Sequence, residues 1–411
     1  MALSLNLGFD ALLAVFFPLA LFAVVLRSNI GLNLRHRAWG TLLDVVSLRA
    51  RKSSHGPFSL QRAYQSYSQY SRLSAYEISR KHVAYSTLGR AHRRLGNKIG
   101  YPAKLDKLKY VTDLNAVVTE GIAGLAAKEL GVSESFAGHG AELGRVREAL
   151  KHFVRDWSEE GAEEREKIFR PILDVLATVD PVERKHKKVL VPGAGLGRLA
   201  WEISQLGYDT TANELSFFMN LAFRFLLSAD TTPTANEHTL RPYAHWFSHQ
   251  RSNDSLFRAI HFPDAVPRLS PSFRLAESDF LTLSPPGPQS ASTFAWSKSS
   301  DDPDAGYDYI ATLFFIDTSL NALATVQQVH TLLRPGGTWI NLGPLLWTSG
   351  GHAKLELSLE EVICVAEEIG FVFQENGGGK TRTVECEYTR DKNAMMRWVY
   401  GAEFWVATKS K

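Results

Sequence analysis

Cysteine is scarce in this chain of 411 residues, where only Cys364 and Cys386 occur and neither has the spacing of a metal-binding motif. This composition argues against a disulfide framework and a cysteine-based zinc site, and it favours a reducing compartment. The thirteen histidines are scattered without a convincing ligand set, so no metal site is expected. Charge of one sign is not in excess either, because 46 basic residues are balanced by 43 acidic ones. A net charge of +3 with both signs interspersed gives no electrostatic footprint for nucleic acid.

Long apolar runs are absent except for one near the N-terminus, where sixteen apolar residues run without interruption from Ala11 through Leu26. A membrane-spanning helix needs about 20 residues, so this run is short for one. Six basic residues lie between Arg27 and Lys52, and they would keep the chain after an inserted helix in the cytosol. Residues 1–52 therefore have two open interpretations, a possible membrane anchor or an extension that does not span. We expect the catalytic part in the cytoplasm, with the nucleus left open.

Strand-like alternation is absent from residues 53–185, where apolar residues recur at helical spacing, most clearly between Leu143 and Trp157. We expect a helical region here. From residue 186 to 411, seven short β-rich runs alternate with helical segments, which predicts an α/β domain with a doubly wound, mostly parallel, Rossmann-like sheet. The runs are residues 189–191, 208–212, 273–276, 309–315, 338–342, 371–374 and 404–407.

Two connections in this domain are unusual. The last two runs are joined by about thirty residues rich in glycine and charge, with weak helical periodicity, so we expect the final pair of strands to be antiparallel. Residues 215–272 form a long insertion between the second and third strands. It contains an aromatic cluster from His245 to His249, and we expect it to pack as a lid or a substrate wall.

The most informative segment is the glycine turn after the first expected strand, where Gly193, Gly195 and Gly197 alternate with other residues. Such a turn lets the backbone approach a nucleotide and leaves helix N–H groups free. A dinucleotide fingerprint would place its third glycine at Arg198, so the spacing instead suits S-adenosylmethionine, which has no pyrophosphate. Glu214, at the end of the second strand, puts a carboxylate where a ribose diol would lie. A purely structural strand–helix connection stays the alternative.

Acidic residues also follow the third and fourth expected strands, whose carboxyl ends face the ligand crevice of a doubly wound sheet. Asp279 can accept from an exocyclic amino group while Phe280 covers an adenine ring. Asp317 follows the apolar run of the fourth strand, beside the expected position of the cofactor methyl group. Each acid has an alternative role as a helix N-cap.

With these residues assembled, the chain resembles the carnosine N-methyltransferase family from about Phe58 to Ala407. This resemblance implies a class I methyltransferase sheet of seven strands. The motifs that carry it are residues 153–161 (FVRDWSEEG), 191–200 (VPGAGLGRLA), 213–214 (NE), 314–318 (FFIDT), 339–346 (WINLGPLL) and 355–358 (LELS).

The resemblance also implies a role for each site residue. It assigns the imidazole dipeptide to Asp317 and Tyr400, which would be catalytic, with Tyr388 lining the same pocket. The chain departs from the family at two positions: His152 replaces a glutamine, and Thr348 replaces a histidine that contacts substrate, for which His352 is a shifted candidate. The residues expected around S-adenosylmethionine are His152, Arg155, Gly193, Gly195, Glu214, Asp279 and Phe280.

The implied reaction is methylation of the imidazole ring of carnosine to give anserine, or of a related histidine-containing dipeptide. Asp317 would accept the N–H of one ring nitrogen and so direct the lone pair of the other to the methyl group. Two alternatives remain open: methylation of histidine within a protein, which Thr348 mildly favours, and a non-catalytic scaffold that binds S-adenosylmethionine. The expected partner is a small dipeptide, and a homodimer is left open.

Overall fold

The fold is described by a computed structural model, which places residues 56–133, 141–287, 305–347, 353–375 and 378–410. Residues Pro57–Lys411 form one compact unit, so the helical region and the sheet belong together. The apolar segment from Ala11 to Leu26 lies outside the described residues. Within those residues, no helix has both the length and the apolar character needed to cross a membrane.

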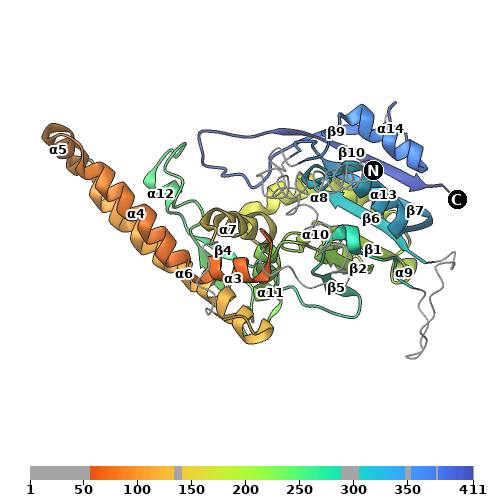
Figure 1. Cartoon of the computed structure of the whole chain (residues 1–411), viewed down its shortest axis with the longest axis horizontal. Coiled ribbons are helices and arrows are strands. Elements are labelled where there is room, and N and C mark those ends of the chain that lie inside the picture. The colour runs from red at the N-terminus through yellow and green to blue at the C-terminus, as the bar shows by residue number, and fades with distance from the viewer. Residues whose placement is uncertain (1–55, 134–140, 288–304, 348–352, 376–377, 411) are drawn as a thin grey trace, which may run out of the picture. The chain divides into compact units, whose positions relative to one another are not determined.

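The expected helical region is confirmed. Its longest helix is α6, which lies between Gly100 and Gly131. Both glycines have the left-handed conformation, which glycine adopts without penalty. The pair α4 and α6 packs side by side, with α5 at the far end (Figure 1). The helices are α3 (Leu60–Ser68), α4 (Tyr70–Ser86), α5 (Arg90–Lys98), α6 (Tyr101–Leu130), α7 (Leu143–Trp157), α8 (Ala162–Ala177) and α9 (Pro181–Arg184), with a 3₁₀ turn, η1 (Glu159–Gly161), before α8.

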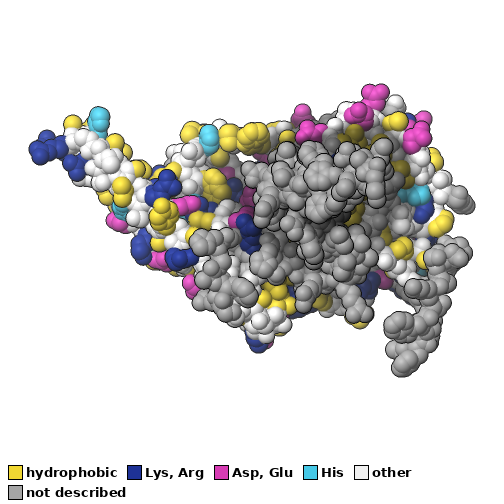
Figure 2. All heavy atoms as spheres, viewed as in Figure 1, with side chains coloured by type: hydrophobic (Ala, Val, Ile, Leu, Met, Phe, Trp, Pro, Cys, Tyr) yellow, Lys and Arg dark blue, Asp and Glu magenta, His cyan; other side chains and the backbone are white. Residues whose placement is uncertain are grey.

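Positive charge is concentrated at the end of this helix pair. Helix α5 carries four exposed basic side chains, Arg90, Arg93, Arg94 and Lys98. Figure 2 shows dark blue side chains gathered there. The mixture of basic and acidic residues along the whole sequence therefore does not extend to α5, although the net charge of the chain is only +3.

The predicted doubly wound sheet is also confirmed, with strand order β5-β2-β1-β6-β7-β10-β8. Strands β5, β2, β1, β6 and β7 are parallel, whereas β10 is antiparallel to both β7 and β8, as expected for the final pair. An edge strand that the sequence did not predict, β9, pairs with β10. The strands are β1 (Lys188–Pro192), β2 (Asp209–Asn213), β5 (Phe273–Ala276), β6 (Tyr307–Leu313), β7 (Leu333–Gly343), β8 (Phe371–Phe373), β9 (Arg382–Cys386) and β10 (Tyr400–Lys409).

Helices cover both faces of this sheet, as the side chains of β1 demonstrate. Val189 and Val191 pack with residues of α10 (Arg198–Gln205), whereas Leu190 packs with residues of α13 (Ala322–Leu332). Because neighbouring residues of a strand point to opposite faces, α10 and α13 lie on opposite sides. Helix α14 (Leu359–Ile369) packs beside α13 (Figure 1).

The expected insertion lies between β2 and β5. It contains α11 (Phe217–Leu227), α12 (Asn253–Leu256) and a small two-stranded sheet of β3 (His238–Leu240) and β4 (Ile260–Phe262). Its aromatic residues pack on the helical region, where Phe262 lies 4.6 Å from Phe153 between ring centroids. The insertion therefore packs against the helical region, and its expected role as a lid or a substrate wall stays a prediction.

Register brings the carboxyl ends of the parallel strands to one edge. Pro192 of β1 pairs with Asn213 of β2, and Asn213 pairs with Ala276 of β5. On the other side of β1, Leu313 of β6 pairs with Leu342 of β7. The glycine turn, Glu214 and the acidic residues that follow β5 and β6 all start from this edge.

Candidate active site

The three glycines of the turn after β1 have two different roles. All three have positive φ, at 62° for Gly193, 57° for Gly195 and 74° for Gly197. A Cβ atom on Gly193 would lie 2.5 Å from the ring of Phe315, and one on Gly197 would lie 2.3 Å from Phe223. On Gly195 the nearest heavy atom would be Nη2 of Arg155, 3.9 Å away. Gly193 and Gly197 therefore permit packing, whereas the Cβ face of Gly195 is open apart from Arg155.

Glu214 closes the turn from the end of β2. Its Oε2 accepts a hydrogen bond from the Gly195 N–H at 2.9 Å, and its Oε1 accepts one from the Ser216 N–H at 2.7 Å. Burial raises the pKa of Glu214. A carboxylate has about four acceptor positions, so both oxygens retain capacity for a further donor.

Helix α7 contributes a buried ion pair on the other side of Gly195. The Arg155 guanidinium donates to both carboxylate oxygens of Asp156, at 2.6 and 2.9 Å, in the bidentate arrangement that is strongest for this pair. Burial alone would raise the pKa of Asp156, but the Arg155 guanidinium brings it well below its usual range. This pairing holds the guanidinium in place beside the turn.

His152 lies one helical turn before Asp156 and is buried. Its Nδ1 lies 3.8 Å from Asp156 Oδ2, too far for a hydrogen bond, and it has no other partner among the described residues. Burial lowers the pKa of His152, which favours the neutral form of the ring. A buried polar atom usually has a hydrogen-bond partner, and a polar group of a bound cofactor would supply one here.

An aromatic wall joins this region to the carboxyl end of β6. The Tyr388 ring lies 4.5 Å from the Arg155 guanidinium carbon and 4.6 Å from the Phe314 ring. Phe314 also meets Tyr400 edge-on at 5.6 Å. Phe314 itself has φ of 49°, an uncommon conformation for a bulky residue. Strand β6 therefore ends at Leu313, two residues before the end expected from the sequence. Burial raises the pKa of Tyr388.

Asp317 follows Phe314 in the 3₁₀ turn η3 (Ile316–Thr318) and is only 4% exposed. Its Oδ2 accepts a hydrogen bond from the Leu346 N–H at 3.0 Å, and burial raises its pKa. The alternative role of Asp317 as a cap of the next helix is wrong, because Asn321 caps α13. Within the described residues, Oδ1 of Asp317 accepts no hydrogen bond from another residue, which leaves an acceptor in a buried setting.

Asp279 and Phe280 approach the same turn through Phe315. The Phe280 ring is buried and meets Phe315 edge-on at 5.2 Å, and Phe315 packs on Gly193. Asp279 is exposed and accepts from the Leu281 N–H at 2.9 Å, so it does cap the short turn η2 (Phe280–Thr282). Capping uses one carboxylate oxygen and leaves the other available.

Comparison with known proteins identifies the family. The family model described as carnosine N-methyltransferase matches residues 133–411. The chain is 32% identical to the carnosine N-methyltransferase of Schizosaccharomyces pombe over 75% of its own length and 83% of the relative's. It is 33% identical to that of Mus musculus, over 75% of this chain and 76% of the relative. The chain belongs to the carnosine N-methyltransferase family.

Two solved methyltransferases align with more than half of this chain, at low identity and low TM-scores. The magnesium protoporphyrin IX methyltransferase of Synechocystis, solved with bound SAH, aligns with 64% of this chain and 93% of its own, at 11% identity and a TM-score of 0.35. A methyltransferase of Listeria monocytogenes aligns with 59% of this chain and 98% of its own, at 11% identity and a TM-score of 0.34. The strand order, rather than these scores, defines the fold.

Most residues that the resemblance to the carnosine N-methyltransferase family singled out lie in one connected network. Contacts link Glu214 to Gly195, Arg155 to Tyr388, and Phe314 to Tyr400. Thr348 and His352 lie outside the described residues, so their roles stay predictions. Sequence reasoning missed Asp156, Phe314 and Phe315 as members of the site. Asp156 could have been found from its local position, because it follows Arg155 on a helix whose neighbouring apolar positions are buried.

Proposed function

We propose that this protein methylates the imidazole ring of carnosine, or of a related histidine-containing dipeptide, with S-adenosylmethionine as methyl donor. The observation that carries this proposal is the aromatic wall of Phe314, Tyr388 and Tyr400, which meets Arg155 beside the open face of Gly195. A small aromatic ring fits against such a wall, next to a turn that suits a nucleoside. The names of the relatives support the same substrate.

Each part of the cofactor has a matching group in the chain. Glu214 would accept from the ribose hydroxyls, and Arg155 with His152 would bind the carboxylate and amino group of the methionine moiety. Asp279 and Phe280 would hold the adenine. When bound, S-adenosylmethionine supplies an electrophilic methyl group on a sulfonium, which needs orientation more than activation.

The substrate imidazole needs a chosen tautomer. A free imidazole has a pKa of about 6.5, so near neutral pH a nucleophilic lone pair is present without a strong base. Asp317 would accept the N–H of one ring nitrogen, so that the other nitrogen presents its lone pair. As positive charge develops on the ring, the buried carboxylate stabilises it. The raised pKa of Asp317 also favours its taking up the N–H proton afterwards.

A histidine within a protein is the second candidate substrate. The residues just before Tyr400 expose large apolar side chains, with Trp398 68% and Val399 56% exposed. Apolar side chains exposed together are typical of surfaces that contact another polypeptide. This surface adjoins the aromatic wall, as a site for a longer substrate would require.

The test uses purified protein with S-adenosylmethionine and, in separate reactions, carnosine, free histidine and histidine-containing peptides of increasing length. Methyl incorporation into carnosine, located on the imidazole ring by mass spectrometry, supports the proposal. Faster turnover of the longer peptides than of carnosine favours the second candidate. No methylation of any imidazole, despite measurable cofactor binding, contradicts both.

A further inference from the structure

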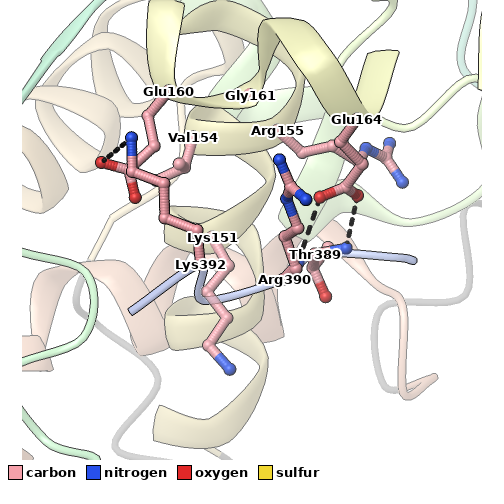
Figure 3. A pocket seen from close by; sticks show the side chains of 9 residues that line it. All are labelled: Lys151, Val154, Arg155, Glu160, Gly161, Glu164, Thr389, Arg390 and Lys392. Atoms are coloured by element: carbon pink, nitrogen blue, oxygen red, sulfur yellow. Dashed lines mark hydrogen bonds and ion pairs between the residues drawn. The ribbon is translucent and has the colours of Figure 1, made fainter. Parts of the chain in front are cut away.

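Glu164 joins helix α8 to the segment between β9 and β10, although the two are far apart in the sequence. Its Oε1 accepts a hydrogen bond from the Thr389 N–H at 2.6 Å, and its Oε2 accepts one from the Arg390 N–H at 3.1 Å. Figure 3 shows the carboxylate facing this backbone. Glu164 is 5% exposed, so both bonds are shielded from water. Buried bonds to a charged acceptor are among the stronger contributions to local structure.

The backbone that Glu164 holds is strained. Thr389 has φ of 49°, and a β-branched residue in this left-handed region is an outlier. A conformation of this kind persists only where the surroundings over-determine it. Thr389 directly follows Tyr388, so the turn at Thr389 restrains the backbone that carries the Tyr388 ring. The carboxylate of Glu164 therefore acts one residue away from the aromatic wall.

Other ionic contacts hold the same segment through side chains on both sides of Tyr388. Asp391 accepts from Arg258 at 2.7 Å and from Gln250 at 2.9 Å, and Arg258 also pairs with Glu160. The side chain of Arg390 pairs with Glu387 and Glu163. These pairs fix the segment around Asp391, whereas Glu164 alone among the described side chains bonds the backbone of Thr389.

The space beside Glu164 is too small for a substrate. The cavity lined by Glu164, Arg155 and Thr389 has a volume of about 10 Å³, about the room that one water molecule needs. Glu164 therefore does not bind a dipeptide itself. Its effect on the site has to pass through the backbone that it holds.

We propose that Glu164 is a positioning residue for substrate binding: by fixing the backbone after Tyr388, it holds the Tyr388 ring between Arg155 and Phe314 and so sets the affinity for the dipeptide. This inference rests on the proposed function, in which Tyr388 lines the substrate pocket. Cofactor affinity should depend little on Glu164, because the Glu214–Gly195 bond does not involve the segment after β9 and because Asp156 holds the Arg155 guanidinium independently of Tyr388.

The first experiment compares Glu164→Gln with Glu166→Gln. The glutamine keeps one acceptor oxygen but turns an amide N–H₂ toward a backbone N–H, whereas Glu166 is an exposed residue of the same helix paired only with Arg170. For Glu164→Gln we expect the Kd for carnosine, measured by calorimetry with S-adenosylhomocysteine bound, to rise about tenfold. Its Kd for S-adenosylhomocysteine should change less than about twofold, and Glu166→Gln should change neither. Equal losses of both affinities would overturn the inference.

The second experiment asks whether the effect passes through Tyr388. Glu164→Gln should cost little further carnosine affinity in a Tyr388→Ala background, because the ring that it positions is gone. Fully additive losses would contradict the inference. If Glu164→Gln does not fold, Glu164→Asp, which keeps the charge on a shorter side chain, replaces it in the same cycle.

Hydrogen exchange separates this inference from the proposed function. The amide hydrogens of Thr389 and Arg390 should exchange faster in Glu164→Gln than in the parent and Glu166→Gln, whatever the substrate is. Unchanged exchange at both amides would contradict the role of the two Glu164 hydrogen bonds in holding this backbone. If exchange rises as expected but the parent protein neither binds nor methylates carnosine, it is the proposed function that fails.

Discussion

Glu214 Oε2 accepts the Gly195 N–H at 2.9 Å, and this bond ties the end of β2 to the one glycine of the turn that faces open space. The carboxylate thus stabilises the turn and at the same time lies where the ribose of a nucleoside would meet it. Because Glu214 is buried, its negative charge costs free energy, as its raised pKa indicates. Hydroxyl donors of a bound ribose would offset part of that cost.

The first prediction concerns this carboxylate. Glu214→Ala should weaken S-adenosylmethionine binding by about 1–3 kcal/mol, because charge-assisted bonds to the ribose are lost. Calorimetry on the purified variant measures this directly, with the exposed Glu237→Ala as control. An unchanged Kd would mean that the ribose binds elsewhere and that Glu214 serves only the turn.

The second prediction separates the two kinds of glycine. Gly197→Ala should destabilise the fold, because its Cβ would overlap Phe223, and the Tm should fall. Gly195→Arg is strained by the positive φ but meets no steric overlap, so it should leave a folded protein that does not bind the cofactor, since its side chain enters the open face of the turn. Thermal melts and cofactor titrations on both variants test this contrast. If Gly195→Arg retains cofactor affinity, the open face of the turn is not the site.

Much of this architecture could be predicted from the sequence because the signals are local. The glycine turn and Glu214 lie within one strand–helix–strand unit, and β1 is a short apolar run close to the expected length. Strand β9 was not predicted, because its Arg, Thr and Glu residues are largely exposed at an edge and resemble a charged loop. Strands β3 and β4 have three residues each, too few to show a period.

The missing parts of the site are those that depend on tertiary contacts. Glu164 lies 225 residues before Thr389, so no local pattern connects them. The positive φ of Phe314 could not be predicted from the sequence either, because an aromatic residue after an apolar run predicts a continued strand. By contrast, Asp317 could be found because it ends such a run, although its hydrogen bond to Leu346 could not.

The third prediction concerns the N-terminal segment. Deleting residues 1–52 should leave turnover with carnosine within about twofold of the full chain, because Pro57–Lys411 form one compact unit. The Phe58 carbonyl, which accepts from the Phe217 N–H at 3.0 Å, is retained in this truncation. Steady-state kinetics on both proteins decides the matter. A soluble but inactive truncation would show that the segment belongs to the catalytic fold, and recovery of the full chain without detergent would argue against an anchor.

The last prediction sets activity against stability at Asp317. Asp317→Asn can keep the bond from Leu346 through its amide oxygen, but it loses the charge that stabilises a reacting imidazole, so turnover should fall by about 10²-fold or more. Stability should move the other way. Burial raises the pKa of Asp317 above its value in the unfolded chain, so the folded state binds more protons and loses stability as pH rises through that window. Removing the charge avoids this loss at neutral pH.

The matched control for Asp317→Asn is Asn321→Ala, which removes the cap of α13 and should lower stability by about 1 kcal/mol while leaving turnover near that of the parent. Single-turnover methylation of carnosine at saturating cofactor, combined with melts at several pH values, compares the two variants. A catalytic Asp317 gives a slow enzyme whose Tm at pH 7 equals or exceeds that of the parent. A variant that melts early and keeps its rate within a few-fold would instead make Asp317 a structural residue, and the orientation of the imidazole would then have to come from Tyr388 and Tyr400.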